Sequence, residues 1–183
     1  MGAGKSKKKE VILVGLDGSG KTTTLRYVVE GADKNREVAP TVGYAQELLK
    51  KRFSVDLCVR DFGGAKNYRM LWKTQYQSVN GVIFVVDSAD QDRLQEAAEE
   101  LKKLMHDESL GSNGKVVLLI LANKSDLPQA LPASEVAEVL GVSGEDSPVH
   151  NYEFHIASTS AINGTGVVEA FHWIADRLKR VGK

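Results

Sequence analysis

Residues 15–22, Gly15-Leu16-Asp17-Gly18-Ser19-Gly20-Lys21-Thr22, decide the fold of this chain. They match the pattern G-x-x-x-x-G-K-[ST] at every fixed position. The apolar, β-branched run at 11–14 predicts a buried strand before them, and residues 23–29 are typical of the opening turns of a helix. A glycine-rich loop between a strand and a helix N-terminus cradles phosphate, because its N–H groups converge and the helix dipole favours an anion. The alternative is an ordinary flexible turn, and the agreement of both flanks argues against it.

The same loop predicts how a nucleotide is held. Lys21 is expected to contact the β- and γ-phosphates, and the hydroxyl of Thr22 is expected to ligate Mg²⁺. The remaining contacts are expected from the other residues of the loop and the helix start, namely Asp17, Gly18, Ser19, Gly20 and Thr23. The loop alone leaves open which base is bound and what is done with the nucleotide.

Composition indicates one intracellular domain. With 183 residues, of which 42% are hydrophobic, the chain is long enough for one substantial core. The formal net charge is zero, which argues against broad binding to nucleic acid. The single cysteine, Cys58, excludes an internal disulfide and lies in an apolar run, so we expect a buried thiol. No apolar run approaches about 18 residues and no secretory signal is present, so we expect a cytoplasmic protein. We also expect it to be a monomer.

Strand-like and helix-like segments alternate along the chain. Strands are predicted at 10–15, 44–50, 53–60, 81–87, 115–122 and 152–157, and helices at 21–30, 91–106, 133–140 and 166–180. No helix separates 44–50 from 53–60, so these strands form a hairpin that turns near 50–52, whereas 141–151 is predicted as a surface loop. The fold class is therefore α/β, a mostly parallel six-stranded sheet with one antiparallel hairpin strand and helices on both faces.

Two motifs at strand ends favour guanine as the base. In Asn123-Lys124-Ser125-Asp126, the carboxylate of Asp126 can accept from N1–H and N2–H₂ of guanine, Lys124 can cover the face of the base, and Asn123 can tie this loop to the phosphate cradle. An aspartate that caps a helix is the alternative. In Ser160-Ala161, a backbone N–H can donate to guanine O6, although the pair means little apart from its position.

Two further motifs predict a metal and a γ-phosphate sensor. In Asp61-Phe62-Gly63-Gly64, Asp61 is expected to hold Mg²⁺ through water and the N–H of Gly64 to meet the γ-phosphate. A plain turn is the alternative. Thr41, in Pro40-Thr41-Val42-Gly43, is a candidate second Mg²⁺ ligand, although it also fits an ordinary loop. GTP or GDP with Mg²⁺ is thus the expected ligand, with Lys21, Thr41 and Gly64 as the catalytic residues.

Together these segments resemble the Arf and Arf-like family of small GTPases over nearly the whole chain. Asp17 and Tyr68-Arg69-x-Leu71-Trp72 separate this family from its Ras-like and Rab-like relatives, and 155–166 looks like the Arf-like branch linked to ciliary membrane coats. The resemblance implies a P-loop NTPase fold, with 10–183 as a single GTPase domain, and a switch in membrane, vesicle or ciliary trafficking. It implies that an exchange factor, a GTPase-activating protein and effectors bind residues 38–76. Tyr44, the hairpin 44–60, Tyr68, Leu71, Trp72 and Tyr76 form that expected surface, and packing beneath it is the alternative for the aromatic residues.

The chain departs from the family pattern at two positions beside this site. Ala65 stands where members usually carry the glutamine that orients the attacking water, so we expect very slow intrinsic hydrolysis unless a partner supplies an arginine. A non-hydrolysing, GTP-dependent binding module is the alternative. A nucleotide kinase is a third reading, but the chain shows neither a lid nor an arginine-rich second site. Arg60 replaces the family's tryptophan before Asp61, which puts the family's partner set in doubt.

The first nine residues are predicted to be a flexible basic tail. Gly2, with Ser6 four residues later, fits a myristoylation signal, and Lys5, Lys7, Lys8 and Lys9 form a basic cluster beside it. One acyl chain with several lysines suffices for peripheral contact with a Golgi, endosomal or ciliary membrane. A solvated tail is the alternative.

Overall fold

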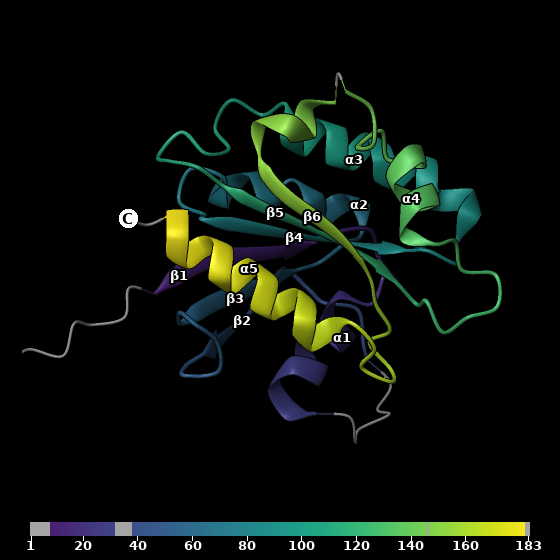
Figure 1. Cartoon of the computed structure of the whole chain (residues 1–183), viewed down its shortest axis with the longest axis horizontal. Coiled ribbons are helices and arrows are strands. Elements are labelled where there is room, and N and C mark those ends of the chain that lie inside the picture. The colour runs from purple at the N-terminus through teal and green to yellow at the C-terminus, as the bar shows by residue number, and fades with distance from the viewer. Residues whose placement is uncertain (1–7, 32–37, 146, 182–183) are drawn as a thin grey trace, which may run out of the picture.

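A six-stranded sheet runs through the computed structural model, which describes residues 8–31, 38–145 and 147–181. Its strands lie in the order β2-β3-β1-β4-β5-β6 (Figure 1). Only β2 runs antiparallel to its neighbour, β3, whereas the other pairs of the described sheet are parallel. The predicted fold class is confirmed. The strand bounds are β1 Lys9–Val14, β2 Tyr44–Leu49, β3 Leu57–Phe62, β4 Gly81–Asp87, β5 Val117–Asn123 and β6 Glu153–Ser158.

Helices cover both faces of this sheet (Figure 1). On one face, α1 and α5 pack against a cluster that contains Val11, Leu13 and Phe171. On the other face, α3 and α4 pack with Trp72 against a cluster that contains Phe84 and Leu118. The α-helices are α1 Lys21–Glu30, α2 Lys66–Arg69, α3 Leu94–Met105, α4 Ala133–Val139 and α5 Val167–Val181, and the 3₁₀ turns are η1 Trp72–Gln75, η2 Gln91–Arg93 and η3 Pro148–Asn151.

Three predicted segments differ from the structure. The strand expected from residue 53 begins only at Leu57, because the ring of Phe53 packs against Phe171 of α5, with 6.0 Å between centroids, and leaves the sheet. The helix expected from residue 91 opens with the 3₁₀ turn η2, and α3 begins at Leu94. The loop expected at 141–151 contains η3, whose first turn is capped by the side chain of Ser147.

The central strands form the most buried part of the described sheet. Every residue of β5 is buried, as are the first six of β4, which is the pattern of parallel strands covered on both faces. Cys58 on β3 is fully buried, as predicted, and burial raises the pKa of its thiol. No described helix is long and apolar enough to cross a membrane. The carboxyl ends of the parallel strands meet at one edge of the sheet, where a ligand is expected in this architecture.

Candidate nucleotide site

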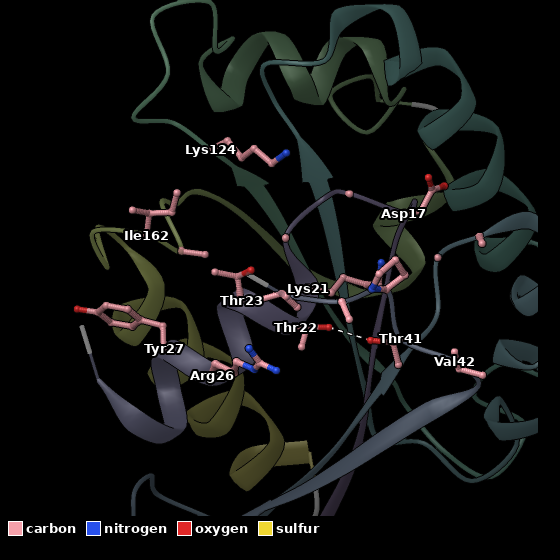
Figure 2. A pocket seen from close by; sticks show the side chains of 18 of the residues that line it. Asp17, Lys21, Thr22, Thr23, Arg26, Tyr27, Thr41, Val42, Lys124 and Ile162 are labelled. Carbon is pink, nitrogen blue, oxygen red and sulfur yellow. Dashed lines mark hydrogen bonds between the residues drawn. The ribbon is translucent and has the colours of Figure 1, made fainter. Parts of the chain in front are cut away.

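A cavity of about 840 Å³ opens at this edge of the sheet (Figure 2). It is within the size range of small-molecule sites. The loop after β1, the start of α1, residues 38–42 and the pair Gly64-Ala65 line its phosphate side, and Lys124, Ala161 and Ile162 line the opposite side. Segments that lie up to 145 residues apart in the sequence, from Asp17 to Ile162, thus line one cavity.

The loop after β1 holds Lys21 through two of its carbonyl oxygens. Its buried Nζ donates hydrogen bonds to the carbonyl oxygens of Gly15 at 3.0 Å and Leu16 at 2.8 Å. Burial lowers the pKa of Lys21 to about 8. Since burial disfavours the ammonium, a bound anion would stabilise the charged form of this side chain.

Gly20 allows this loop to turn into α1. Its φ of +93° is a left-handed conformation, and a β-carbon there would collide with Nδ2 of Asn123. Both the backbone conformation and the packing at position 20 therefore require glycine, the last glycine of the motif. Gly18 and Thr23 line the cavity as well, whereas Ser19 is buried behind it and its Oγ has no hydrogen-bond partner among the described residues.

Three oxygen-bearing side chains meet beside Lys21. The hydroxyl of Thr22 donates to Oδ2 of Asp61 at 2.5 Å, and its Oγ1 lies 3.0 Å from that of Thr41 (Figure 2). Two oxygens at right angles on an octahedral Mg²⁺ lie about 3 Å apart, since each is about 2.1 Å from the metal. Asp61 is buried, which raises its carboxyl pKa, and its Oδ1 has no hydrogen-bond partner within the described chain. These residues fit a magnesium ion.

Gly64, the predicted γ-phosphate sensor, lies against the phosphate loop. A β-carbon on Gly64 would collide with the backbone of Leu16 and Asp17, so only glycine permits this approach. The neighbouring Gly63 donates its N–H to Gly43 at 2.9 Å, which ties the segment to the one that carries Thr41. Ala65 also lines the cavity, and its methyl group can neither donate to water nor accept from it.

The base side of the cavity is organised by Asn123. Its buried amide donates to the carbonyl of Ser19 at 2.9 Å, as predicted for a link to the phosphate loop. Its Oδ1 accepts the N–H of Ala161 at 3.1 Å and the hydroxyl of Thr159 at 3.2 Å. The N–H of Ser160 donates to Thr165 at 2.9 Å. The N–H groups of Ser160 and Ala161 therefore already have acceptors within the protein, and the expected contact with guanine O6 stays a prediction.

Lys124 and Asp126 extend from the end of β5. Lys124 lines the cavity in a left-handed backbone conformation, with φ of +65°, and its Nζ pairs with Asp87 at 2.5 Å. Asp126 is exposed and lies outside the cavity lining. Its predicted contact with the guanine edge would form above the cavity, where its carboxylate is solvated.

Asp17 lies at the junction of the phosphate loop with two arginines. It lines the cavity, but its carboxylate pairs with Arg93 at 2.8 Å and lies 3.6 Å from Arg69. The hydrogen bond from Arg93 holds the pKa of the Asp17 carboxyl below its usual range. The carboxylate thus anchors the loop to η2 and α2, which leaves the backbone of Asp17 to face a phosphate.

The expected partner surface needs a correction. Trp72 is 2% exposed and Tyr76 is 5% exposed, so both aromatic side chains belong to the core in this conformation. The indole of Trp72 donates to the carbonyl of Gly63 at 3.2 Å, which explains why a polar aromatic residue is buried there. Within residues 38–76 the large exposed apolar side chains are Val42, Tyr44, Leu48 and Met70. Tyr44 and Leu48 lie in the predicted surface, whereas Val42 and Met70 were not predicted to belong to it.

Arg60 lies within a polar network beside that surface. Its guanidinium donates to Gln46 at 3.1 Å and to Gln75 at 3.0 Å, and pairs with Glu10 at 3.0 Å. The network joins β2, β3, β1 and η1. A planar charged group, fixed by three partners, therefore occupies the position of the family's tryptophan.

Three larger side chains that belong to none of the motifs also line the cavity. Arg26 and Tyr27 reach it from α1, and Ile162, which is 59% exposed, reaches it from the loop after β6. One signal for Arg26 was available, because residues four apart share a helix face and Arg26 follows Thr22 by four. Gly2 and most of the basic tail lie outside the described residues.

The fold and the cavity together define a P-loop small GTPase. The model of the ADP-ribosylation factor family matches residues 2–178, and the chain belongs to this family. It is similar to the solved structure of the Arl6 BBS3 small GTPase from Trypanosoma brucei with bound nucleotide analogue GppNp. The two chains are 35% identical with a TM-score of 0.82, over 96% of this chain and 99% of that one. Membership makes this chain a guanine-nucleotide-binding GTPase, a switch that binds regulators and effectors, and the predicted family and enzyme class are confirmed.

Proposed function

We propose that this protein is a Mg²⁺-dependent GTP/GDP switch whose unassisted hydrolysis of GTP is slow, and that it acts in membrane trafficking. The observation that carries the proposal is the convergence of Thr22, Thr41 and Asp61 beside Lys21, with 3.0 Å between the two hydroxyl oxygens. Thr41 comes from a separate loop, so a ligand that engages both hydroxyls couples nucleotide state to the position of residues 38–43.

In this proposal each side chain has a defined task. Lys21 and the N–H of Gly64 bind the β- and γ-phosphates, and Thr22, Thr41 and, through water, Asp61 hold the metal. Mg²⁺, when bound, neutralises charge on the β- and γ-phosphates. On the base side, Asp126, Lys124, Asn123 and the Ser160-Ala161 turn select guanine.

Hydrolysis transfers the γ-phosphoryl group to water. The water oxygen bonds to phosphorus while the bond to the β-phosphate oxygen breaks, which yields GDP and inorganic phosphate. Lys21, Gly64 and Thr41 stabilise the charge of this transfer, but Ala65 offers no polar atom to orient the water. A partner that contributes an arginine would accelerate the step by about 10³- to 10⁵-fold.

The second candidate is a GTP-dependent binding module that never turns over. Ala65 favours it. Single-turnover hydrolysis of bound GTP, measured with and without cell extract, separates the two candidates. Extract-stimulated turnover supports the switch, and its absence supports the binding module.

Residues 38–76 are the proposed surface for exchange factor, activating protein and effectors. The exposed apolar side chains of Val42, Tyr44, Leu48 and Met70 all lie within this range and support the assignment, since exposed apolar surface favours recognition. Both segments that would sense the γ-phosphate lie within this range. Acylation of Gly2, together with Lys5–Lys9, is the proposed contact with a Golgi, endosomal or ciliary membrane.

The base assignment is tested by Asp126→Asn. An amide cannot accept both donors of guanine, so this variant is expected to lose affinity for guanosine nucleotides and gain affinity for xanthosine nucleotides. Unchanged affinity for GDP would contradict the base site. Mass spectrometry of the nucleotide that co-purifies with the wild-type protein gives a second reading: mostly GTP indicates impaired hydrolysis, and mostly GDP indicates retained turnover.

A further inference from the structure

Arg26 lies on the phosphate side of the cavity, although it belongs to none of the nucleotide-binding motifs. It follows Thr22 by four residues on α1, so both side chains project from one face of the helix. Arg26 lines the cavity together with Thr22 and Thr41. Figure 2 shows its guanidinium beside Thr22, with Thr22 between it and Thr41.

The guanidinium of Arg26 is available to a ligand. Arg26 is exposed, and no residue in the described part of the chain forms a hydrogen bond or ion pair with it. The two other arginines close to the phosphate loop are already engaged: Arg69 with Glu96 at 2.8 Å and Arg93 with Asp17 at 2.8 Å. Among the described residues that line the cavity, Arg26 is the only arginine.

The guanidinium of Arg26 shares its side of the cavity with Thr22, one of the residues that fit the metal. The other cations near the cavity have different positions, since Lys21 is bound to the carbonyls of the phosphate loop and Lys124 pairs with Asp87. A free guanidinium next to Thr22 is therefore an unpaired positive charge on the side of the cavity where phosphates are expected.

We propose that Arg26 binds a phosphate oxygen of the guanine nucleotide, on the side of the cavity where Thr22 and Thr41 meet. The inference rests on the proposed function, because it assigns a further residue to the same site. A guanidinium suits this role, since its planar set of donors matches phosphate geometry. Arg26 thus adds a second positive charge to that of Lys21 in the same cavity, which Ala65 also lines.

The test compares Arg26→Ala, Arg26→Gln and Arg26→Lys with wild-type protein, using the dissociation constants of a fluorescent GDP in the presence of Mg²⁺. Arg180→Ala is the matched control, since Arg180 is an exposed arginine on α5 outside the cavity lining. We expect Arg26→Ala and Arg26→Gln to weaken GDP about tenfold, because a hydrogen bond to a charged group is lost. Arg26→Lys retains affinity in part, and Arg180→Ala leaves it unchanged.

A second measurement reports on the contact itself. The ³¹P resonances of bound GDP are expected to shift in Arg26→Ala and to keep their positions in Arg180→Ala. The inference would be overturned if Arg26→Ala bound GDP within twofold of wild type. It would also be overturned if Arg26→Gln bound GDP as tightly as wild type, because the side chain would then act through packing and not through its charge. If the wild-type protein itself fails to bind guanosine nucleotides, the proposed function fails instead, so the two failures are distinguishable.

Discussion

Arg69 donates a hydrogen bond from Nε to the carbonyl oxygen of Gly64 at 2.7 Å. The rest of its guanidinium, which is almost fully buried, pairs with Glu96 at 2.8 Å and lies 3.5 Å from Glu100 on α3. The sensor segment is thereby fastened to α3, and through Asp17 to the phosphate loop. A buried arginine with several partners fixes the position of Gly64 without contacting a ligand.

Arg69→Ala is expected to destabilise the fold by about 3 kcal/mol, because it removes a buried guanidinium with its charge-assisted contacts and leaves the carbonyl of Gly64 without this donor. For a chain of this size that lowers the unfolding midpoint by about 6–12 °C. Thermal unfolding checks this. Lys103→Ala is the matched control, since Lys103 pairs with the same Glu100 at 2.9 Å but is 69% exposed, and such pairs contribute about 1 kcal/mol or less. Equal midpoints for the two variants would contradict the proposed fastening.

Ala65→Gln is expected to accelerate single-turnover hydrolysis of GTP. A glutamine at the cavity wall can orient the attacking water, and orientation of this kind accounts for about a hundredfold in rate. Rapid quench of GTP-loaded protein measures the step without product release. Ala65→Leu, which adds bulk and no polar atom, serves as the control. Identical rates for Ala65→Gln and wild type would mean that the missing glutamine does not limit hydrolysis.

Thr22→Asn is expected to weaken Mg²⁺–GTP much more than GDP. The Thr22 hydroxyl lies between Asp61 and Thr41, and the larger amide cannot take its place in a compact octahedral shell. Nucleotide affinities with Mg²⁺ and with excess EDTA measure the effect. The EDTA values of variant and wild type should converge, and equal losses of GTP and GDP would argue against Thr22 as a ligand.

The sequence predicted the site where local residue types determine geometry. The loop 15–22 and the run at 11–14 specify strand, turn and helix by themselves. Asn123 contacts Ser19 as expected, because the carboxyl ends of the parallel strands β1 and β5 meet at one edge of the sheet, with only β4 between them. Trp72 and Tyr76 show the limit of this reasoning. Their exposure depends on how η1 packs against Phe84 and Asp107, which are distant in sequence, and no pattern within residues 68–76 decides it.

The partners of the Asp17 and Arg26 side chains could not be predicted from the sequence for a related reason. Asp17 belongs to the motif, yet its carboxylate is paired with Arg93, which lies 76 residues further along the chain. Arg26 belongs to no motif, yet one helical turn places it beside Thr22. A motif predicts which backbone surrounds a ligand, whereas the partner of each charged side chain depends on tertiary contacts.

His155 at the edge strand β6 provides a pH-dependent prediction away from the nucleotide site. Its ring stacks on Trp173 with 5.0 Å between centroids, and the guanidinium of Arg177, which pairs with Glu153 at 2.9 Å, lies 5.5 Å from the centre of the same indole. Burial and, secondarily, the charge of Arg177 lower the pKa of His155 below 6.5. The unfolded chain therefore binds a proton at higher pH than the folded one, and stability contributed by neutral His155 is lost as pH falls below about 6.5.

Wild-type protein should consequently lose more stability between pH 7.5 and pH 5.5 than His155→Gln, because glutamine does not titrate. Urea unfolding at both pH values measures this difference. An NMR titration of the His155 ring gives the direct check, and Arg177→Gln should move its midpoint upward by removing the repelling charge. A midpoint at or above 6.5 in the wild-type protein, or equal pH dependence of the two proteins, would show that partial burial and the charge of Arg177 do not disfavour the charged ring.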